Sequence, residues 1–256
     1  RPLSGPYPYV WLDALTQRCR DGGRVVNVST LIATAVNKNG NREILGFDVV
    51  TEEDGAGWTS FLRGLVARGL SGVCLAISDA HVGLKNAIAS VLPGAAWQRC
   101  RTHFMRNLLT QVPKNAQSMV ATLVRSIFEQ PDAEAVHAQH ARVIAQLEED
   151  FAKAAKMLTE AGPDVLAFTA FSKSHWRQIR SNNPQERLNK EVRRRTDVVG
   201  IFPNREAVIR LVGAVLAEQD DEWIVTRRYL SPETLPKEVK SPKQHDAPRR
   251  RKKKAA

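Results

Sequence analysis

The chain has 256 residues, 43% of them hydrophobic and 25% charged, and a formal net charge of +11 at pH 7. This length and composition are typical of a globular protein with one large or two small domains, and they exclude a disordered or fibrous chain. No stretch approaches the roughly 18–20 consecutive apolar residues that a membrane span requires, so a transmembrane protein is excluded as well.

The first hundred residues predict alternating strands and helices. Three segments rich in β-branched and aromatic residues come first and predict an antiparallel meander, with an Asn39-Gly40 turn between the second and third. Apolar residues at helical spacing then alternate with two more strands, which predicts an α/β fold with a mixed five-stranded sheet. The expected strands are 7–16, 24–36, 43–50, 72–78 and 95–100, with helices from Trp58 to about Gly69 and over 81–91.

From about residue 102 to 172 the pattern becomes helical throughout. Alanine, leucine, glutamine and glutamate dominate this block, and its apolar residues recur every three or four positions. Pro163 is expected to break the block. Two amphipathic helices follow, one over 184–196 with a proline near its first turn and one over 204–222.

Three acidic residues stand out by their positions. Asp13 interrupts an apolar strand, Asp79 follows the buried strand at 72–78, and Glu186 lies in the first turn of a helix. Open α/β sheets bind ligands at the carboxyl ends of their strands, and converging carboxylates need cations to neutralise them, so the trio is a candidate Mg²⁺ or Mn²⁺ site. Asp79 also fits a helix cap and Glu186 a favourable charge at a helix N-terminus. Asp13 has no such simple structural explanation.

Four segments carry a resemblance to a known family. Together they are similar to the catalytic part of the mutator-type bacterial insertion-sequence transposases, a group of DDE transposases with an RNase H-like fold. The resemblance covers about residues 7–235. The segments are Trp11-Leu12-Asp13-Ala14, residues 73–84 with Ser78-Asp79-Ala80-His81, Trp97 to Asn107 with Cys100 and His103, and residues 181–204 with Asn183-Pro184-Gln185-Glu186-Arg187-Leu188-Asn189-Lys190-Glu191.

The resemblance implies an RNase H-like mixed sheet with flanking helices, interrupted by an all-helical insertion. Asp13, Asp79 and Glu186 match the family's two aspartates and its glutamate, which makes them the expected catalytic residues and ligands of Mg²⁺ or Mn²⁺. Family members also carry an N-terminal DNA-binding region, which this sequence is expected to lack. The implied divisions are 1–103 for the first part of the catalytic core, 104–176 for the helical insertion, 177–230 for the rest of the core with the glutamate helix, and 231–256 for a disordered basic tail.

The implied activity is metal-dependent cleavage of transposon ends and strand transfer into target DNA. Double-stranded DNA is the expected partner, a homo-oligomer on paired ends the expected assembly, and no membrane is involved. Three cysteines, an odd and sparse set, argue against a disulfide framework and favour the cytoplasm, where the protein would associate with the nucleoid. Two alternatives remain: a truncated, non-catalytic DNA-binding remnant of a transposase, or an RNase H-like nuclease that hydrolyses DNA without strand transfer.

Other residues in the matching segments each have more than one interpretation. Cys100 and His103 form an accessory motif that resembles half a zinc site, orients part of the active site, contacts DNA, or packs structurally. The resemblance implies that Trp176 stacks on a flipped base, and the alternative is that it is buried in the core. His81 supports Asp79 or begins a helix. Basic residues near Glu186 hold DNA phosphates or form a solvated helix face; they are Arg187, Lys190, Arg193, Arg194 and Arg195.

The positive charge is concentrated at the end of the sequence. Residues 237–256 contain nine lysines and arginines against two acids, a net +7, which leaves only +4 for the other 236 residues. Such a tail attracts polyanions such as DNA, RNA or an anionic membrane surface, or it is simply a solvated end. Charge alone specifies no partner.

Overall fold

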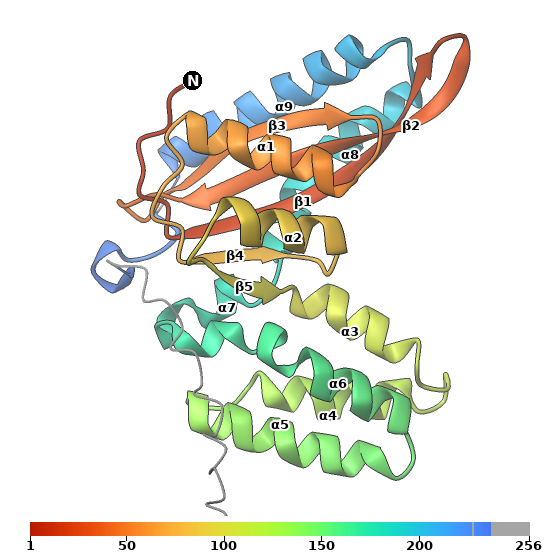
Figure 1. Ribbon diagram of the computed structural model, residues 1–256, viewed down its shortest axis with the longest axis vertical. Helices are drawn as coiled ribbons and strands as arrows, with labels where there is room; N and C mark the ends of the chain where they lie inside the picture. Colours follow the sequence, from red (N-terminus) through yellow and green to blue (C-terminus); the bar gives the residue numbers. More distant parts are fainter. Residues whose placement is uncertain (227, 237–256) are drawn as a thin grey trace, which may run out of the picture.

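The structure, a computed structural model, describes residues 1–226 and 228–236. Within these residues a mixed sheet of six strands has the order β3-β2-β1-β4-β5, and β6 pairs with β1 (Figure 1). β1, β2 and β3 are antiparallel, whereas β4 and β6 run parallel to β1, and β5 runs parallel to β4. The predicted α/β class and mixed sheet are confirmed, with one strand more than expected. The strands are β1 (Tyr9–Asp21), β2 (Arg24–Val36), β3 (Arg42–Val50), β4 (Leu75–Ser78), β5 (Ala96–Arg99) and β6 (Ile201–Phe202).

The first strand extends five residues beyond its predicted end at residue 16. It continues to Asp21 and pairs with β2 along its whole length, because Gly22 and Gly23 adopt φ values of 54° and 80° and close a two-residue hairpin turn. The extension is polar on one side only: Arg18 and Arg20 are exposed, while Cys19 is buried. The same extension pairs with β6, so the missed end of β1 and the unpredicted sixth strand have one origin.

Helices cover both faces of the sheet. Helices α1 (Gly55–Ala67) and α2 (Val82–Val91) lie on one face, and α8 (Asn183–Val199) and α9 (Arg205–Val225) lie on the other (Figure 1). The alternation of β1 serves both faces, because Val10 and Leu12 pack in the core under α1 and α2, while Leu15 packs in the core under α8 and α9. The two predicted C-terminal helices are confirmed, with Pro184 in the first turn of α8.

The predicted helical block lies beyond β5, at the lower end of the molecule in Figure 1. Its core is continuous with the sheet through Tyr9, Trp11, Leu75 and Ile77. Its helices are α3 (Arg101–Leu109), α4 (Gln117–Ile127), α5 (Ala133–Glu148), α6 (Ala152–Val165) and α7 (Trp176–Ile179), with 3-10 turns η1 (Ala167–Ala170) and η2 (Lys173–His175).

The expectation that Pro163 breaks this block is wrong. Pro163 lies inside α6, in its last turn. A proline there removes one backbone hydrogen bond, but Leu158, Ala161 and Val165 are buried in the core, and this packing holds the turn in place.

The chain remains ordered beyond the point where a basic tail was expected to begin. Residues 232–234 form the 3-10 turn η3 (Pro232–Thr234), and Leu230 and Leu235 are buried in the core. The Thr234 hydroxyl lies 2.7 Å from His175 Nε2, which ties this segment to the helical block. The boundary predicted at residue 231 is therefore too early for 231–236, and the rest of the predicted tail, 237–256, lies outside the described residues.

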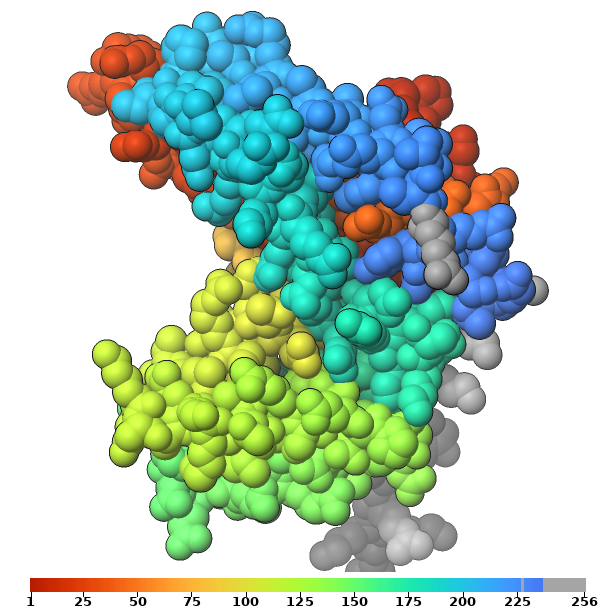
Figure 2. All heavy atoms as spheres, turned by 180° about the vertical axis from the view of Figure 1, so that it is seen from behind, coloured from red at the N-terminus to blue at the C-terminus, as the bar shows by residue number. Residues whose placement is uncertain are grey.

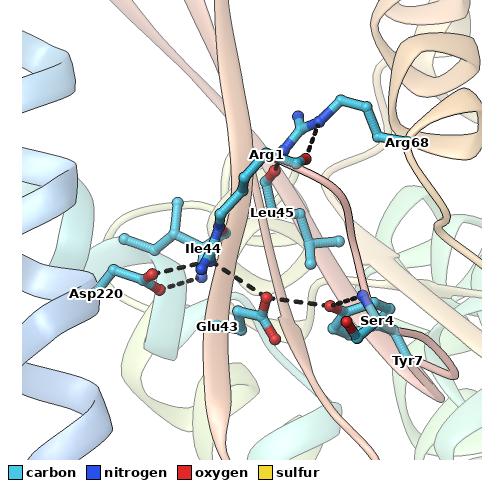
Figure 3. A network of polar contacts seen from close by, with 8 residues as sticks. All are labelled: Arg1, Ser4, Tyr7, Glu43, Ile44, Leu45, Arg68 and Asp220. Atoms are coloured by element: carbon cyan, nitrogen blue, oxygen red, sulfur yellow. Dashed lines mark hydrogen bonds and ion pairs between the residues drawn. The ribbon is translucent and has the colours of Figure 1, made fainter.

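A polar network joins the first residues to the edge strand β3 and to α9 (Figure 3). Asp220 of α9 accepts the backbone N–H of Ile44 at 2.8 Å, and the guanidinium of Arg1 lies 2.9 Å from the same carboxylate. Arg1 also contacts Glu43, which accepts the Tyr7 hydroxyl at 3.1 Å. Burial and the Glu43 charge raise the pKa of Tyr7 to about 12. No helix in the described part of the chain is long and apolar enough to cross a membrane.

Candidate active site

Asp13 lies in β1, and Asp79 directly follows β4, the parallel neighbour of β1. In the pairing of β1 with β4, Tyr9 is opposite Leu75 and Trp11 is opposite Ile77, so partners differ by 66 in residue number. Asp13 and Asp79 also differ by 66. Asp79 follows the last residue of β4, so continuing the register two residues beyond the Trp11–Ile77 pair brings it beside Asp13, in the middle of β1 and at the carboxyl end of β4.

Glu186 approaches this strand end from α8. It lies in the first turn of that helix, and its side chain remains 34% exposed. Because Tyr9, Trp11, Asp13 and Leu15 alternate along β1 toward one face, Asp13 points to the face that α8 and the helical block share. The Coulomb influence of both Asp79 and Glu186 on Asp13 is consistent with this convergence.

A cleft of about 280 Å³ separates α8 from α3 at this point. The surface is hollowed here between the teal α8 and the yellow-green start of the helical block (Figure 2). Four residues at helical spacing on α8 present one face to the cleft. The polar and charged residues that line the cleft are Asp13 from β1, His103 and Arg106 from α3, and Glu186, Asn189, Lys190 and Arg193 from α8.

A hydrogen-bond chain holds Asp13 in place. Asn189 donates from Nδ2 to Asp13 Oδ2 at 2.7 Å, and its own Oδ1 accepts from Gln185 Nε2 at 3.3 Å. Gln185 in turn accepts the Thr34 hydroxyl at 2.7 Å. Sequence reasoning missed Gln185 and Asn189 as site residues. Asn189 lies three residues after Glu186 and four after Gln185 on one helix, and this spacing was a usable signal.

Cys100 contacts the start of the segment that carries Glu186, and Asn182 extends the link to the strand that carries Asp13. Its Sγ accepts the backbone N–H of Asn182 at 3.2 Å, just before α8 begins. Asn182 Nδ2 donates to the carbonyl of Leu12, the neighbour of Asp13, at 3.1 Å. Burial raises the pKa of the Cys100 thiol, so the group is protonated at neutral pH. Of the four interpretations of the accessory motif, the contacts of Cys100 fit a packed, positioning role.

Replacing Cys100 with alanine should lower the free energy of unfolding by about 1–3 kcal/mol. The substitution leaves the fully buried N–H of Asn182 without an acceptor and opens a small cavity. Urea unfolding of Cys100→Ala and of Cys100→Ser measures this, and serine, which keeps an acceptor, should recover part of the loss. Equal midpoints for wild type and Cys100→Ala would contradict the positioning role.

The electrostatics of the cleft favour a bound cation. Burial is the main cause that raises the pKa of Asp13 to about 7; Asp79 and Glu186 raise it further, and His103 opposes the shift. Glu186 Oε1 is buried without a hydrogen bond, since His103 Nε2 lies 3.7 Å away, too far to form one. Carboxylate oxygens that are destabilised or unpartnered in this way fit the oxygen-ligand preference of Mg²⁺ and Mn²⁺.

The three acids are not gathered as tightly as another group of potential ligands. Within the described residues, one set of three His, Cys or acidic side chains brings its ligand atoms within 4.8 Å of one another, and it consists of Cys100, His103 and Glu186. The protonated thiol and its hydrogen bond from Asn182 make Cys100 a poor ligand in this state. Without a cation, repulsion between the carboxylates favours the wider spacing of the acidic trio.

The five basic candidates fall into three groups. Lys190 and Arg193 line the cleft, whereas Arg187 lines a separate cavity on the next face of α8. Arg194 and Arg195 pair with Glu191, at 2.6 and 3.4 Å, and form an exposed helix surface as the alternative interpretation expected. Arg106 of α3 also lines the cleft and was not among the candidates.

Trp176 and His81 both have structural partners. Trp176 is only 7% exposed, stacks edge-on against Phe168 at 5.2 Å and donates its indole N–H to the Phe171 carbonyl. This packing favours the core interpretation over base stacking. His81 caps α2 by accepting the N–H of Leu84 on Nδ1, which favours the helix-start interpretation.

Comparison with known proteins defines the family. The family model described as "Transposase, Mutator family" matches residues 1–226. The chain belongs to this family. The matched region includes every element from β1 to α9. It therefore contains the whole cleft and all three acidic residues, Asp13, Asp79 and Glu186.

Several curated relatives of this Mutator-family chain are transposases of insertion sequences. It is 61% identical over 236 residues to the transposase for IS1081 of Mycobacterium tuberculosis, and the aligned region covers 92% of this chain and 57% of that relative. It is 41% identical over 234 residues to the IS406 transposase of Burkholderia multivorans, covering 90% and 60%. The transposase for IS256 in transposon Tn4001 of Staphylococcus aureus is 39% identical over 228 residues, covering 88% and 58%. The chain thus spans less than two thirds of the length of these relatives.

Proposed function

We propose that this chain is the catalytic part of a DDE transposase with an RNase H-like fold. The observation that carries the proposal is that Asp13 and Glu186 line one cleft of a Mutator-family chain, while Asp79 directly follows the neighbouring strand β4. The mixed sheet with helices on both faces, and the helical block between β5 and α8, support the fold assignment. We assign the proposed insertion, residues 104–176, to this block.

The reaction is phosphoryl transfer on double-stranded DNA. Asp13, Asp79 and Glu186 would hold Mg²⁺ or Mn²⁺, which when bound stabilises the negative charge that develops on the phosphate oxygens. Hydrolysis at a transposon end breaks one P–O bond and frees a 3′ hydroxyl. That hydroxyl then attacks a target phosphodiester, which exchanges one P–O bond for another. The product of the second step joins the element to its target.

The remaining cleft residues bind and orient. Lys190, Arg193 and Arg106 place positive charge around the cleft, where they bind DNA phosphates and position the reacting one. Asn189 fixes the carboxylate of Asp13 through its 2.7 Å hydrogen bond. Two DNA ends processed together would require a homo-oligomer on DNA, and the substrate places the protein at the nucleoid.

Metal-dependent nicking and joining of DNA test this function. The chain is incubated with supercoiled plasmid in Mn²⁺ or Mg²⁺, with EDTA as the control, and nicked and strand-joined products are resolved on gels. Nicked and joined products that require the metal support a transposase. Nicked products alone would indicate a nuclease, and DNA binding without nicking under any metal would indicate a non-catalytic remnant.

A further inference from the structure

A second cavity, of about 450 Å³, lies beside the candidate active site on the next face of α8. Arg101 from α3, Arg177 and Arg180 from the region of α7, and Arg187 from α8 all line it, and we call it the arginine pocket. Glu186 and Arg187 are consecutive residues on a helix, so they point about 100° apart, one into each cavity. Figure 2 shows the place, where the yellow start of α3, the green α7 and the teal α8 meet.

The arginine pocket has a large excess of positive charge. In the part of the chain that the structure describes, none of its four guanidinium groups forms an ion pair within 4.0 Å. Burial and the neighbouring Arg101 and Arg177 lower the pKa of Arg180 to about 10, and Glu129 offsets this only from beyond ion-pair distance. Four like charges around a partly buried space are unfavourable until an anion enters it.

The arginine pocket also lies where the start of α3 meets the end of α7 and the start of α8. The backbone N–H of Arg101, at the start of α3, donates to the carbonyl of Arg180 at 3.0 Å. The hydroxyl of Thr102 donates to Asn183 Oδ1 at the start of α8, also at 3.0 Å. An anion in the pocket would therefore lie against Arg101 and Arg180, which this backbone bond joins, and against Asn183 at the start of the helix that carries Glu186.

We propose that the arginine pocket binds a phosphate of the DNA strand whose course continues into the active-site cleft. This proposal rests on the proposed function, because it takes its ligand from the same DNA. Guanidinium groups match phosphate oxygens in a two-pronged geometry, and a single strand that passes over α8 can reach both of its faces. The strand would then be held on either side of Glu186, which places the reacting phosphate against the acids.

The test removes charge without disturbing packing. Arg177 and Arg187 are exposed, and their side chains form no hydrogen bond within the described residues. Arg180, in contrast, donates to the carbonyl of Phe128, and Arg101 lies over the Phe128 ring. The double variant Arg177→Ala/Arg187→Ala is therefore compared with the matched control Arg63→Ala/Arg210→Ala, which removes two exposed arginines from α1 and α9. Binding of a fluorescent duplex is followed by anisotropy in EDTA over a series of salt concentrations.

We expect the double variant to bind DNA about 5–10-fold more weakly at 100 mM salt. The slope of log K against log salt should fall by about 1, as for the loss of roughly one phosphate contact, while the control pair should keep the wild-type slope. An unchanged slope, or the same loss in the control pair, would overturn the proposal. So would a pocket that takes only free phosphate, seen as a melting-temperature rise in inorganic phosphate that the double variant loses while its DNA binding stays at the wild-type value.

The two proposals fail in different experiments. Binding is measured in EDTA, so it does not depend on catalysis. If the slope changes as expected but the wild type never nicks DNA in Mn²⁺, the proposed function fails and the arginine pocket stands. If nicking is metal-dependent but the double variant binds with the wild-type slope, the pocket proposal fails alone.

Discussion

Replacing Glu186 with glutamine should reduce metal-dependent nicking about 1,000-fold or more. Glutamine keeps the size of the side chain but removes the charge that would hold the cation. Charge stabilisation by a catalytic metal contributes several kcal/mol, and a loss of about 4 kcal/mol corresponds to three orders of magnitude in rate. The fold should tolerate the change to within about 1 kcal/mol, because a carboxylate in the first turn of a helix contributes no more than that.

Glu191→Gln is the matched control for this variant. It makes the same chemical change five residues along α8, where Glu191 pairs with Arg194 and Arg195 away from the cleft. Its nicking rate should stay within about twofold of wild type, as for the loss of surface ion pairs. Rate constants from plasmid nicking in Mn²⁺ and urea unfolding midpoints are measured for all three proteins. A Glu186→Gln variant that nicks as fast as Glu191→Gln would show that Glu186 is not part of the catalytic site.

Without metal, the stability of this chain should fall as pH rises from about 4 to about 7, through the contribution of Asp13. Its pKa is about 7 in the fold, against an ordinary value of 3.8. Over this range the folded state therefore holds a proton that the unfolded state has lost. Linkage then makes the free energy of unfolding decrease with pH, by on the order of 3 kcal/mol in total, and the decrease ends above pH 7.

The variant Asp13→Asn should lose this decline. In EDTA it should be more stable than wild type at pH 8 by about 1–3 kcal/mol and equally stable near pH 4, because asparagine does not ionise. Asp21→Asn, at the exposed end of the same strand, should follow the wild-type curve. Saturating Mn²⁺ should remove the decline in wild type, since a cation bound to Asp13 favours its ionised form. Parallel curves for wild type and Asp13→Asn between pH 4 and 8 would refute the raised pKa.

Much of the sheet could be predicted from local pattern. The strand over 24–36 is confirmed at both ends, because its β-branched residues are bounded by two turns. The end of β1 was missed because Arg18 and Arg20 face solvent on either side of the buried Cys19. A segment this polar has the composition of a loop, although its burial alternates as in a strand. β6 has two residues and exists only because β1 extends far enough to pair with it. Pro163 shows the opposite error. The rule that proline ends a helix predicted a break there, but the buried residues of α6 keep the helix intact.

The candidate site, too, could be predicted from the sequence only in part. Asp13, Asp79 and Glu186 were proposed from position and resemblance, and the parallel pairing of β1 with β4, whose register brings Asp79 toward Asp13, needed the structure. Asn182 could not be identified, because its role depends on a contact with Leu12 of β1, 170 residues away in sequence. The arginine pocket likewise combines residues from α3, α7 and α8, and no single segment shows its charge.

Binding of Mn²⁺ tests the central claim most directly. Paramagnetic resonance counts bound Mn²⁺ on wild type and on Asp79→Asn, each with a DNA duplex present so that a site completed by DNA is included. Asp79 is suitable because asparagine keeps the acceptor for the N–H of His81. We predict that wild type binds Mn²⁺ and that Asp79→Asn binds it at least 10-fold more weakly. Equal affinity in the two proteins would contradict a metal site built from Asp13, Asp79 and Glu186.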